Sequence, residues 1–165
     1  MELKEIKGDL IKLAKEGKFD VIAHGCNCQC MMGAGIAVLM RENFNAHKFE
    51  LEHISHRADI NKLGQIDFNT VNRQTGNVIR NWNSFEALYE GLIVVNAYTQ
   101  FHGGANLDYE ALQLCLRKMN AMFKGQRIGL PMIGCGIAGG DWNRVRHMIR
   151  QELVDCDVTI VIYNR

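Results

Sequence analysis

The sequence predicts a single α/β domain, with helices covering the faces of one β-sheet. Short β-prone runs alternate with helical patterns along the 165 residues, and two of these runs pass through glycine-rich turns into helices. No internal repeat, low-complexity segment or linker divides the chain, so we expect one domain spanning residues 1–165. The expected strands are 3–7, 20–24, 65–71, 77–81, 92–100, 127–133 and 158–163.

Helical spacing of apolar residues predicts three amphipathic helices, at 36–44, 112–123 and 141–153. Asn106 or Asp108 is the predicted N-cap of the second helix, and Asp141 is that of the third. The charged segment 46–56 also has a helical pattern. The segment 65–81 predicts a hairpin that turns near residues 75–77.

The composition is that of an ordinary globular protein, with 47% hydrophobic and 22% charged residues and a net charge of +1. No basic run predicts a nucleic-acid surface, so an anionic ligand must be held by local geometry. The N-terminus has no signal-peptide pattern, and no apolar stretch approaches the roughly 20 residues of a membrane span. We expect a cytoplasmic monomer with reduced cysteines and no membrane partner.

Two segments share one layout, in which a buried strand leads through a glycine-rich turn into a helix. They are VIAHGCNCQCMMGAGIAVLM at 21–40 and IGLPMIGCGIAGGDW at 128–142. Glycines let the backbone approach a ligand closely, and the unpaired amides at a helix start attract phosphate. Two such loops on one α/β domain predict a clamp on a diphosphate at the carboxyl ends of the strands.

Other readings of these loops fit less well. Neither loop has the Gly-Lys-Ser/Thr of a P-loop, and the first lacks the third glycine of a Rossmann fingerprint. His24, Cys26, Cys28 and Cys30 are spaced too tightly for a zinc knuckle, and we expect no metal and no cofactor. Cys135 remains open as a nucleophile whose glycine loop lowers its pKa.

The sequence resembles the macrodomain family in three ordered motifs: Gly8-Asp9 after the first strand, HGCNCQCMMGAGIA at 24–37 and LPMIGCGIAGGDW at 130–142. It is most similar to the branch of small ADP-ribose-1''-phosphate phosphatases and ADP-ribosyl hydrolases, which includes phage-encoded members. The resemblance implies a three-layer α/β/α fold with a central mixed β-sheet. It also implies ADP-ribose or ADP-ribose-1''-phosphate as the ligand, with ADP-ribosylated macromolecules as further partners.

By the resemblance, Asp9 binds the adenine amino group beside Leu10, and Tyr163 stacks on adenine; a plain cap or packing role is the alternative for each. The first loop is similar to one that lines the diphosphate and distal ribose, and the second to one that cradles phosphates through backbone amides. The implied loop residues are Met32, Gly33, Ala34, Gly35 and Ile36, and then Ile133, Gly134, Cys135, Gly136, Ile137 and Ala138.

Three residues are candidate catalytic groups. Asn27 matches an Asn that contacts the distal ribose hydroxyls and is needed for turnover in several branches. His24 lies near a strand end and titrates near neutral pH when unperturbed, so it is a candidate acid or base, with packing as the alternative. Gln100, with Tyr98 and His102 beside it, ends the long apolar strand where it can position a water.

The chain departs from one hydrolase branch, which uses a Lys late in the strand matching 92–100 and an Asp in the second glycine loop. Val94-Val95-Asn96-Ala97-Tyr98 and Ile137-Ala138-Gly139 stand there instead. We therefore expect direct attack by water on ADP-ribose-1''-phosphate or a related bond at the distal ribose. The alternatives are a non-catalytic ADP-ribose-binding module and a hydrolase that removes ADP-ribose from protein or nucleic acid.

Overall fold

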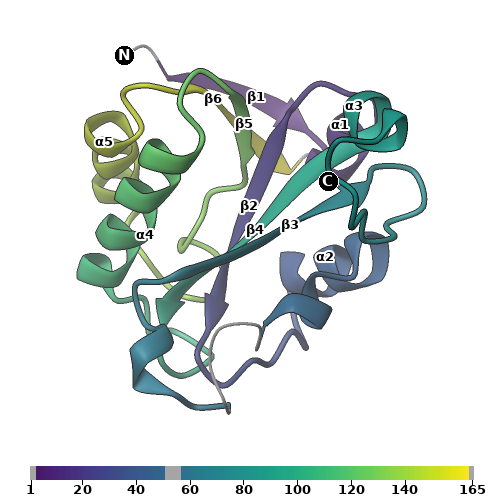
Figure 1. Ribbon diagram of the computed structural model, residues 1–165. Coiled ribbons are helices and arrows are strands. Elements are labelled where there is room, and N and C mark those ends of the chain that lie inside the picture. The colour runs from purple at the N-terminus through teal and green to yellow at the C-terminus, as the bar shows by residue number, and fades with distance from the viewer. Residues whose placement is uncertain (1–2, 51–56, 164–165) are drawn as a thin grey trace.

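The computed structural model describes residues 3–50 and 57–163, which form a six-stranded sheet with helices on both faces (Figure 1). The strand order is β1-β6-β5-β2-β4-β3, and every neighbouring pair is parallel except β3 with β4. This mixed sheet confirms the predicted fold class. The strands are β1 Lys4–Gly8, β2 Val21–Asn27, β3 Ile66–Asn72, β4 Gly91–Gln100, β5 Arg127–Leu130 and β6 Asp157–Tyr163.

Helices lie on both faces of the sheet, with α4 and α5 on one side and α2 on the other (Figure 1). Asp108 and Asp141 cap α4 and α5 by accepting hydrogen bonds of 3.0 Å from the backbone amides of Ala111 and Asn143, as predicted. None of the described helices is long and apolar enough to cross a membrane. The helices are α1 Leu10–Lys15, α2 Ile36–Phe44, α3 Phe85–Glu90, α4 Tyr109–Met122 and α5 Trp142–Glu152, with short 3-10 helices η1 Ala46–Phe49 and η2 Ile60–Lys62.

Alternate residues of β2 point to opposite faces of the sheet and so build two separate cores. Val21 packs with the residues of α4 and α5, whereas Ile22 packs with those of α1 and α2. Both side chains are fully buried. The sheet is therefore the middle layer of three, and its carboxyl edge is left for the loops.

The expected hairpin forms its turn but not its second strand. The amide of Gly76 donates to the carbonyl of Asn72 over 2.7 Å, and Gly76 has φ +77°. Beyond it, only the single bridge from Val78 to Val71 joins the sheet. The strand expected at 77–81 is wrong because the chain turns away after Ile79 to reach α3, a helix that the sequence did not predict.

Two further strands end at other residues than the sequence predicted. β2 continues to Asn27, and β5 stops at Leu130 because the next residue, Pro131, has no N–H to continue the ladder. The helix expected over 46–56 begins as the short η1, and residues 51–56 lie outside the described part of the chain.

Candidate functional site

The candidate residues lie along one edge of the sheet, where the parallel strands end. Asp9 follows β1, Tyr163 ends β6, and residues 133–138 follow β5. Residues 32–36 follow β2, and Gln100 ends β4. Because the order of these strands is β1-β6-β5-β2-β4, the structure arranges the candidates as one continuous row.

The two glycine loops touch each other in the middle of this row. Gly35 has φ +62°, and a Cβ built on it would lie 3.2 Å from Cδ1 of Ile137. Ile137 is 58% exposed. A Cβ at Gly33 or Gly136 would meet no atom within 4 Å. The loops therefore border a shared, open surface.

Both loops present backbone amides that have no partner. None of the amides of residues 32–36 donates to an acceptor in the described chain, and neither do those of Gly136, Ile137 and Ala138. The amides of Gly35 and Ile36 also begin α2, where the helix places partial positive charge. Such clustered N–H groups favour an anion with several oxygens, such as a diphosphate.

The second loop keeps its shape through glycines packed against Leu107. A Cβ at Gly134, where φ is +75°, would lie 2.9 Å from Leu107. A Cβ at Gly140 would lie 2.4 Å from Leu107 and 2.6 Å from the carbonyl oxygen of Gly134. Burial raises the pKa of the half-buried Cys135 thiol to about 11, and Asp141 adds to the shift. Cys135 therefore stays a thiol, which argues against the nucleophile that the sequence left open.

Asp9 and Tyr163 lie together at one end of the row, because Gly8, which directly precedes Asp9, pairs in register with Tyr163. Oδ1 of Asp9 caps α1 by accepting from the amides of Ile11 and Lys12 at 3.0 and 3.2 Å. Its Oδ2 has no donor among the described residues, and the side chain is exposed. Tyr163 is 65% exposed.

Leu10, which the sequence placed beside Asp9 at the ligand, points elsewhere. Its side chain is 4% exposed and packs in the core between the sheet and α1 and α2. The first turn of α1 carries Leu10 inward while Asp9 stays outside. Leu10 can therefore contact the ligand only through its backbone, and its binding role stays a prediction.

Asn27 lies half-buried at the end of β2 and braces the start of the first loop. Its Nδ2 donates to the carbonyl of Met31 over 3.1 Å, and its Oδ1 accepts from the amide of Met31 over 3.2 Å. A Cβ at Gly103 would lie 3.6 Å from this Nδ2, so the loop after β4 passes directly beside it. An amide has two donors and two acceptor sites, so Asn27 keeps one of each for a ligand.

His24 belongs to the core. It is fully buried, and its Nε2 lies 2.7 Å from Oδ1 of Asn96, an oxygen that can only accept. Nε2 therefore carries the proton. Burial lowers the pKa of His24 to about 4, against an opposing effect of the Asn96 hydrogen bond. A neutral imidazole without solvent contact cannot activate water at the edge, so the acid–base role expected for His24 does not fit.

Gln100 is also committed to structure. It is 7% exposed, and Nε2 donates to the carbonyls of His102 and Gly104 at 2.7 and 2.9 Å. Gln100 therefore fixes the loop after β4, and its amide protons are not available to a water. Tyr98 is fully buried, with Nζ of Lys62 4.1 Å from its ring centre. Of the three candidates at this strand end, His102 alone is exposed.

Within the described ranges, no three His, Cys, Asp or Glu side chains are grouped as metal ligands. Cys26, Cys28 and Cys30 are buried free thiols. A cavity of 610 Å³ lies away from the loops, beside β3 and residues such as Asn77, Arg80 and Trp82. The candidate site is thus an open edge lined by backbone.

The comparisons with known proteins agree with this geometry, although no family model matches the chain. The chain is 31% identical over 169 residues to an uncharacterized 17.5 kDa protein of Enterobacteria phage T4, covering 98% of this chain and 96% of that protein. It is 25% identical over 161 residues to human ADP-ribose glycohydrolase OARD1, covering 96% and 88%. It is 36% identical over 58 residues to an ADP-ribose 1''-phosphate phosphatase of Meyerozyma guilliermondii, covering 34% and 33%.

The solved structures with a similar fold agree with these sequence relatives. The macrodomain of Thermus aquaticus DarG matches with a TM-score of 0.67 and 17% identity, covering 99% of both chains. The chain belongs to the macrodomain family. This macrodomain also matches Thermosipho africanus DarTG in complex with ADP-ribose, with a TM-score of 0.67 and 16% identity, covering 99% of this chain and 41% of that one.

The loop after β4, where the sequence analysis named only His102, also borders the candidate site. Gly103 lies beside Asn27, and a Cβ at Gly139 would lie 3.2 Å from Cβ of Ala105. The loop after β4 therefore borders both the first and the second glycine loops. The signal was available as the pair Gly103-Gly104 directly after a long buried strand.

Proposed function

We propose that this macrodomain binds ADP-ribose along the carboxyl edge of its sheet and hydrolyses ADP-ribose-1''-phosphate or a related bond at the distal ribose. The observation that carries the proposal is the contact between two loops of unpaired amides, within the row of strand ends that runs from Asp9 to Gln100. Relatives named ADP-ribose glycohydrolase and ADP-ribose 1''-phosphate phosphatase support it. A structural neighbour in complex with ADP-ribose supports the ligand.

The ligand would extend along the row of strand ends. Oδ2 of Asp9 accepts the adenine amino group, and the exposed ring of Tyr163 stacks on the base. The amides of the two glycine loops then hold the diphosphate. The remaining donor and acceptor of Asn27 bind the vicinal hydroxyls of the distal ribose.

For turnover, water attacks the terminal phosphorus, a new P–O bond forms, and the ester P–O bond breaks to release phosphate and ADP-ribose. Loop amides stabilise the charge that develops on the phosphoryl oxygens. His102, which is exposed on the loop that passes Asn27, takes the proton of the attacking water, and the leaving ribose oxygen takes a proton from solvent.

Calorimetry with ADP-ribose tests the binding site through two substitutions of one residue. Asp9→Ala removes both the helix cap and the adenine acceptor, whereas Asp9→Asn keeps an efficient cap and changes only the charged acceptor. We expect micromolar binding that weakens at least about tenfold in both variants. Asp155→Asn is the control, because Asp155 precedes β6 at the opposite edge of the sheet and bonds to Asn120 near the end of α4. Absence of binding in the wild type would overturn the proposal.

Phosphate release from ADP-ribose-1''-phosphate then tests the reaction. We expect Asn27→Ala to abolish release, and His102→Ala to lower kcat by roughly 100-fold or more while leaving the affinity for ADP-ribose nearly unchanged. A His102→Ala variant with full kcat would remove His102 from the mechanism.

One observation favours a second candidate function, a module that binds ADP-ribose without turnover. His24 and Gln100, two of the three side chains expected to be catalytic, are held in the scaffold. Tight binding with no release of phosphate, and no release of ADP-ribose from modified protein or nucleic acid, would favour this module over a hydrolase.

A further inference from the structure

Four large apolar side chains are exposed together at the opposite end of the sheet from the glycine loops. Trp82, Phe85, Leu88 and Tyr89 are 74%, 80%, 72% and 70% exposed, respectively. We call these four residues the aromatic patch. Three of them belong to α3, a helix that buries none of its side chains. This is unusual, because surface helices of globular proteins normally turn their apolar face to the core.

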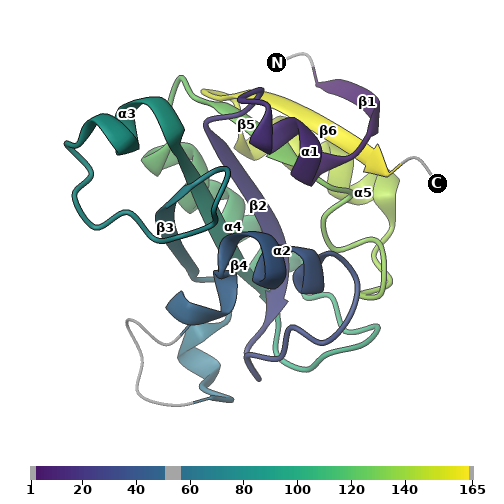
Figure 2. The same cartoon turned by 90° about the vertical axis from the view of Figure 1, so that its right-hand side faces the viewer.

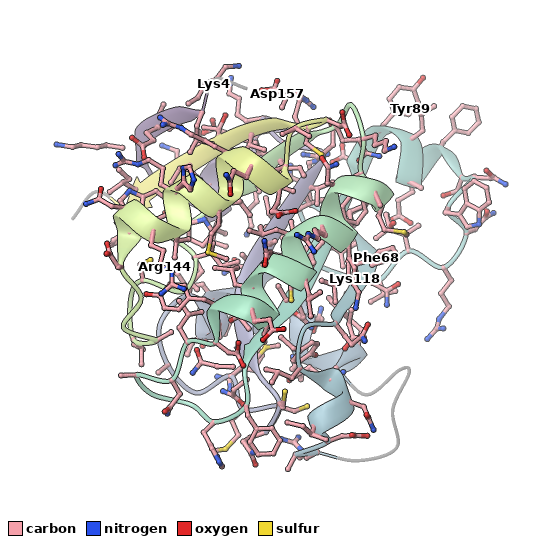
Figure 3. All side chains as sticks on the ribbon, turned by 90° about the vertical axis from the view of Figure 1, so that its left-hand side faces the viewer. Lys4, Phe68, Tyr89, Lys118, Arg144 and Asp157 are labelled. Carbon is pink, nitrogen blue, oxygen red and sulfur yellow. The ribbon has the colours of Figure 1, made fainter. Side chains whose placement is uncertain are left out.

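Three residues of the aromatic patch share one face of α3, because Phe85, Leu88 and Tyr89 stand at helical spacing. The rings of Phe85 and Tyr89, one helical turn apart, are stacked with centroids 6.2 Å apart and planes inclined by 8°. Trp82 lies in the turn that precedes α3, and Leu88 and Tyr89 are neighbours in the helix. Figure 3 shows Tyr89 at an outer corner of the molecule, and Figure 2 shows α3 standing apart from the other helices.

Polar contacts hold α3 in place. Oγ of Ser84 caps the helix by accepting from the amide of Ala87, and Asn72 donates to Glu86 over 2.9 Å. The buried Arg73 donates through its backbone amide to the carbonyl of Glu90 and through its side chain to the carbonyl of Gly91, at 2.8 and 2.6 Å. A six-residue helix is unstable alone, so these contacts fix it. The apolar side chains are therefore not used in packing within the chain.

The area of the aromatic patch is large enough for association. With exposures of 70% or more, its four side chains present on the order of 600 Å² of mainly apolar surface. Monomers rarely expose a larger contiguous apolar patch, and a stable interface takes about 800 Å² from each partner. The aromatic patch thus supplies most of one side of a standard interface.

The charges around the aromatic patch are complementary to a second copy of the same surface. Arg80 is exposed before the patch, and Glu90, whose carboxylate also interacts with Arg73, lies half-buried at its end. When two copies of α3 pack antiparallel about a two-fold axis, the beginning of one helix lies against the end of the other. Arg80 of each copy then faces Glu90 of the other. We propose that the aromatic patch is a two-fold interface through which two copies of this chain form a dimer, in place of the monomer expected from sequence.

This dimer leaves both candidate ligand sites open. α3 leads directly into the first residue of β4, whereas the loop beside Asn27 follows the last residue of that strand (Figure 1). The two glycine-loop edges of the dimer therefore face away from each other. Two sites on one particle bind a multiply modified target more tightly than one site does.

Sedimentation velocity on the full chain tests the dimer directly. We expect the wild-type mass to rise from 18.7 kDa toward twice that value with a dissociation constant on the order of micromolar. The double variant Phe85→Glu and Leu88→Glu should remain a single chain, because it places four like charges in the interface. Val154→Glu, at another exposed apolar residue, is the matched control and should dimerise as the wild type does. A wild type that stays monomeric at every concentration, as when a different protein covers the patch, overturns the proposal.

Self-cross-linking distinguishes a two-fold interface from irregular association. Leu88 lies near the middle of the patch, so a Leu88→Cys variant should form a disulfide-linked dimer rapidly under mild oxidation. Met122→Cys, exposed to 54% at the end of α4, should not. Equal cross-linking of the two variants contradicts the two-fold arrangement.

Discussion

At the carboxyl edge of the sheet, the inner side, which faces the core, and the outer side, which faces solvent, carry different chemical groups. Inside, His24, Asn96 and Gln100 are buried with their side chains hydrogen-bonded. Outside, the loops at 32–36 and 136–138 present backbone amides that have no partner among the described residues. The difference teaches that the side chains typical of catalysis stabilise the scaffold here, and it supports our proposal that the main chain contributes much of the ligand binding.

The alternation of β2 explains how two neighbouring residues come to serve opposite sides. His24 points toward the core beneath α1 and α2, and Gly25 points toward the second glycine loop. A Cβ at Gly25 would lie 3.0 Å from Oγ1 of Thr99 and 3.9 Å from the amide nitrogen of Gly134. The absence of a side chain at Gly25 therefore lets the second loop approach the strand closely.

The largest expected effect is a loss of folding stability at low pH, caused by His24 on the inner side. The pKa of His24 is about 4 in the folded protein and near 6.5 when unfolded, so the unfolded chain binds more protons between these values. The folding stability that neutral His24 contributes is fully present above pH 6.5 and is lost as the pH falls from 6.5 to 4. The loss should reach about 3 kcal/mol in wild type. His24→Gln removes this titration, and thermal unfolding of both proteins from pH 7 to 4 measures the difference. Equal pH slopes would mean that His24 is not held neutral.

A smaller effect tests the outer side through two glycines of one loop. Gly140→Ala places a methyl group against Leu107 and the carbonyl of Gly134, which should cost about 2 kcal/mol and displace the loop amides. Gly136→Ala meets no atom within 4 Å, so the thermal midpoint should not change. Calorimetry with ADP-ribose should show lost binding for Gly140→Ala. Full affinity in that variant would contradict recognition through the loop amides.

The smallest expected effect is the loss of stability on replacing Gln100, which is buried but holds the exposed loop after β4. Gln100→Ala removes both hydrogen bonds to the loop after β4, but the freed carbonyls can bind water, so we expect a loss of about 1 kcal/mol. Hydrogen exchange should increase in residues 101–106. Gln113→Ala, which removes a contact with Glu152 away from this loop, is the control. A catalytic Gln100 would instead lower turnover without changing exchange.

Much of the fold could be predicted because apolar periodicity reports directly on burial. The helix at 36–44 was predicted within its observed bounds, since Met40 and Phe44 are fully buried on its inner face. The same reasoning missed α3. Its Phe85, Leu88 and Tyr89 have helical spacing, but the helix is only six residues long and buries none of its side chains, so the pattern was too short to interpret.

The candidate site was predictable where glycines signal a backbone requirement, as at Gly35 and Gly134, both with positive φ. It was not predictable where a side chain's role depends on a distant partner. The sequence gives no sign that His24 meets Asn96, because 72 residues separate them. The same limit applies to Leu10, whose direction is set by the first turn of α1.

The pairing of β1 with β6 has a consequence for the order in which the protein is built. β1 hydrogen-bonds only to β6 in the described sheet, and Lys4 lies opposite Thr159. During synthesis, β1 therefore leaves the ribosome long before its partner exists, and contacts between such distant residues form late in folding. Asp9 and Tyr163 come together only through this pairing. A nascent chain can thus assemble its glycine loops while the end of the site nearest β1 is still missing.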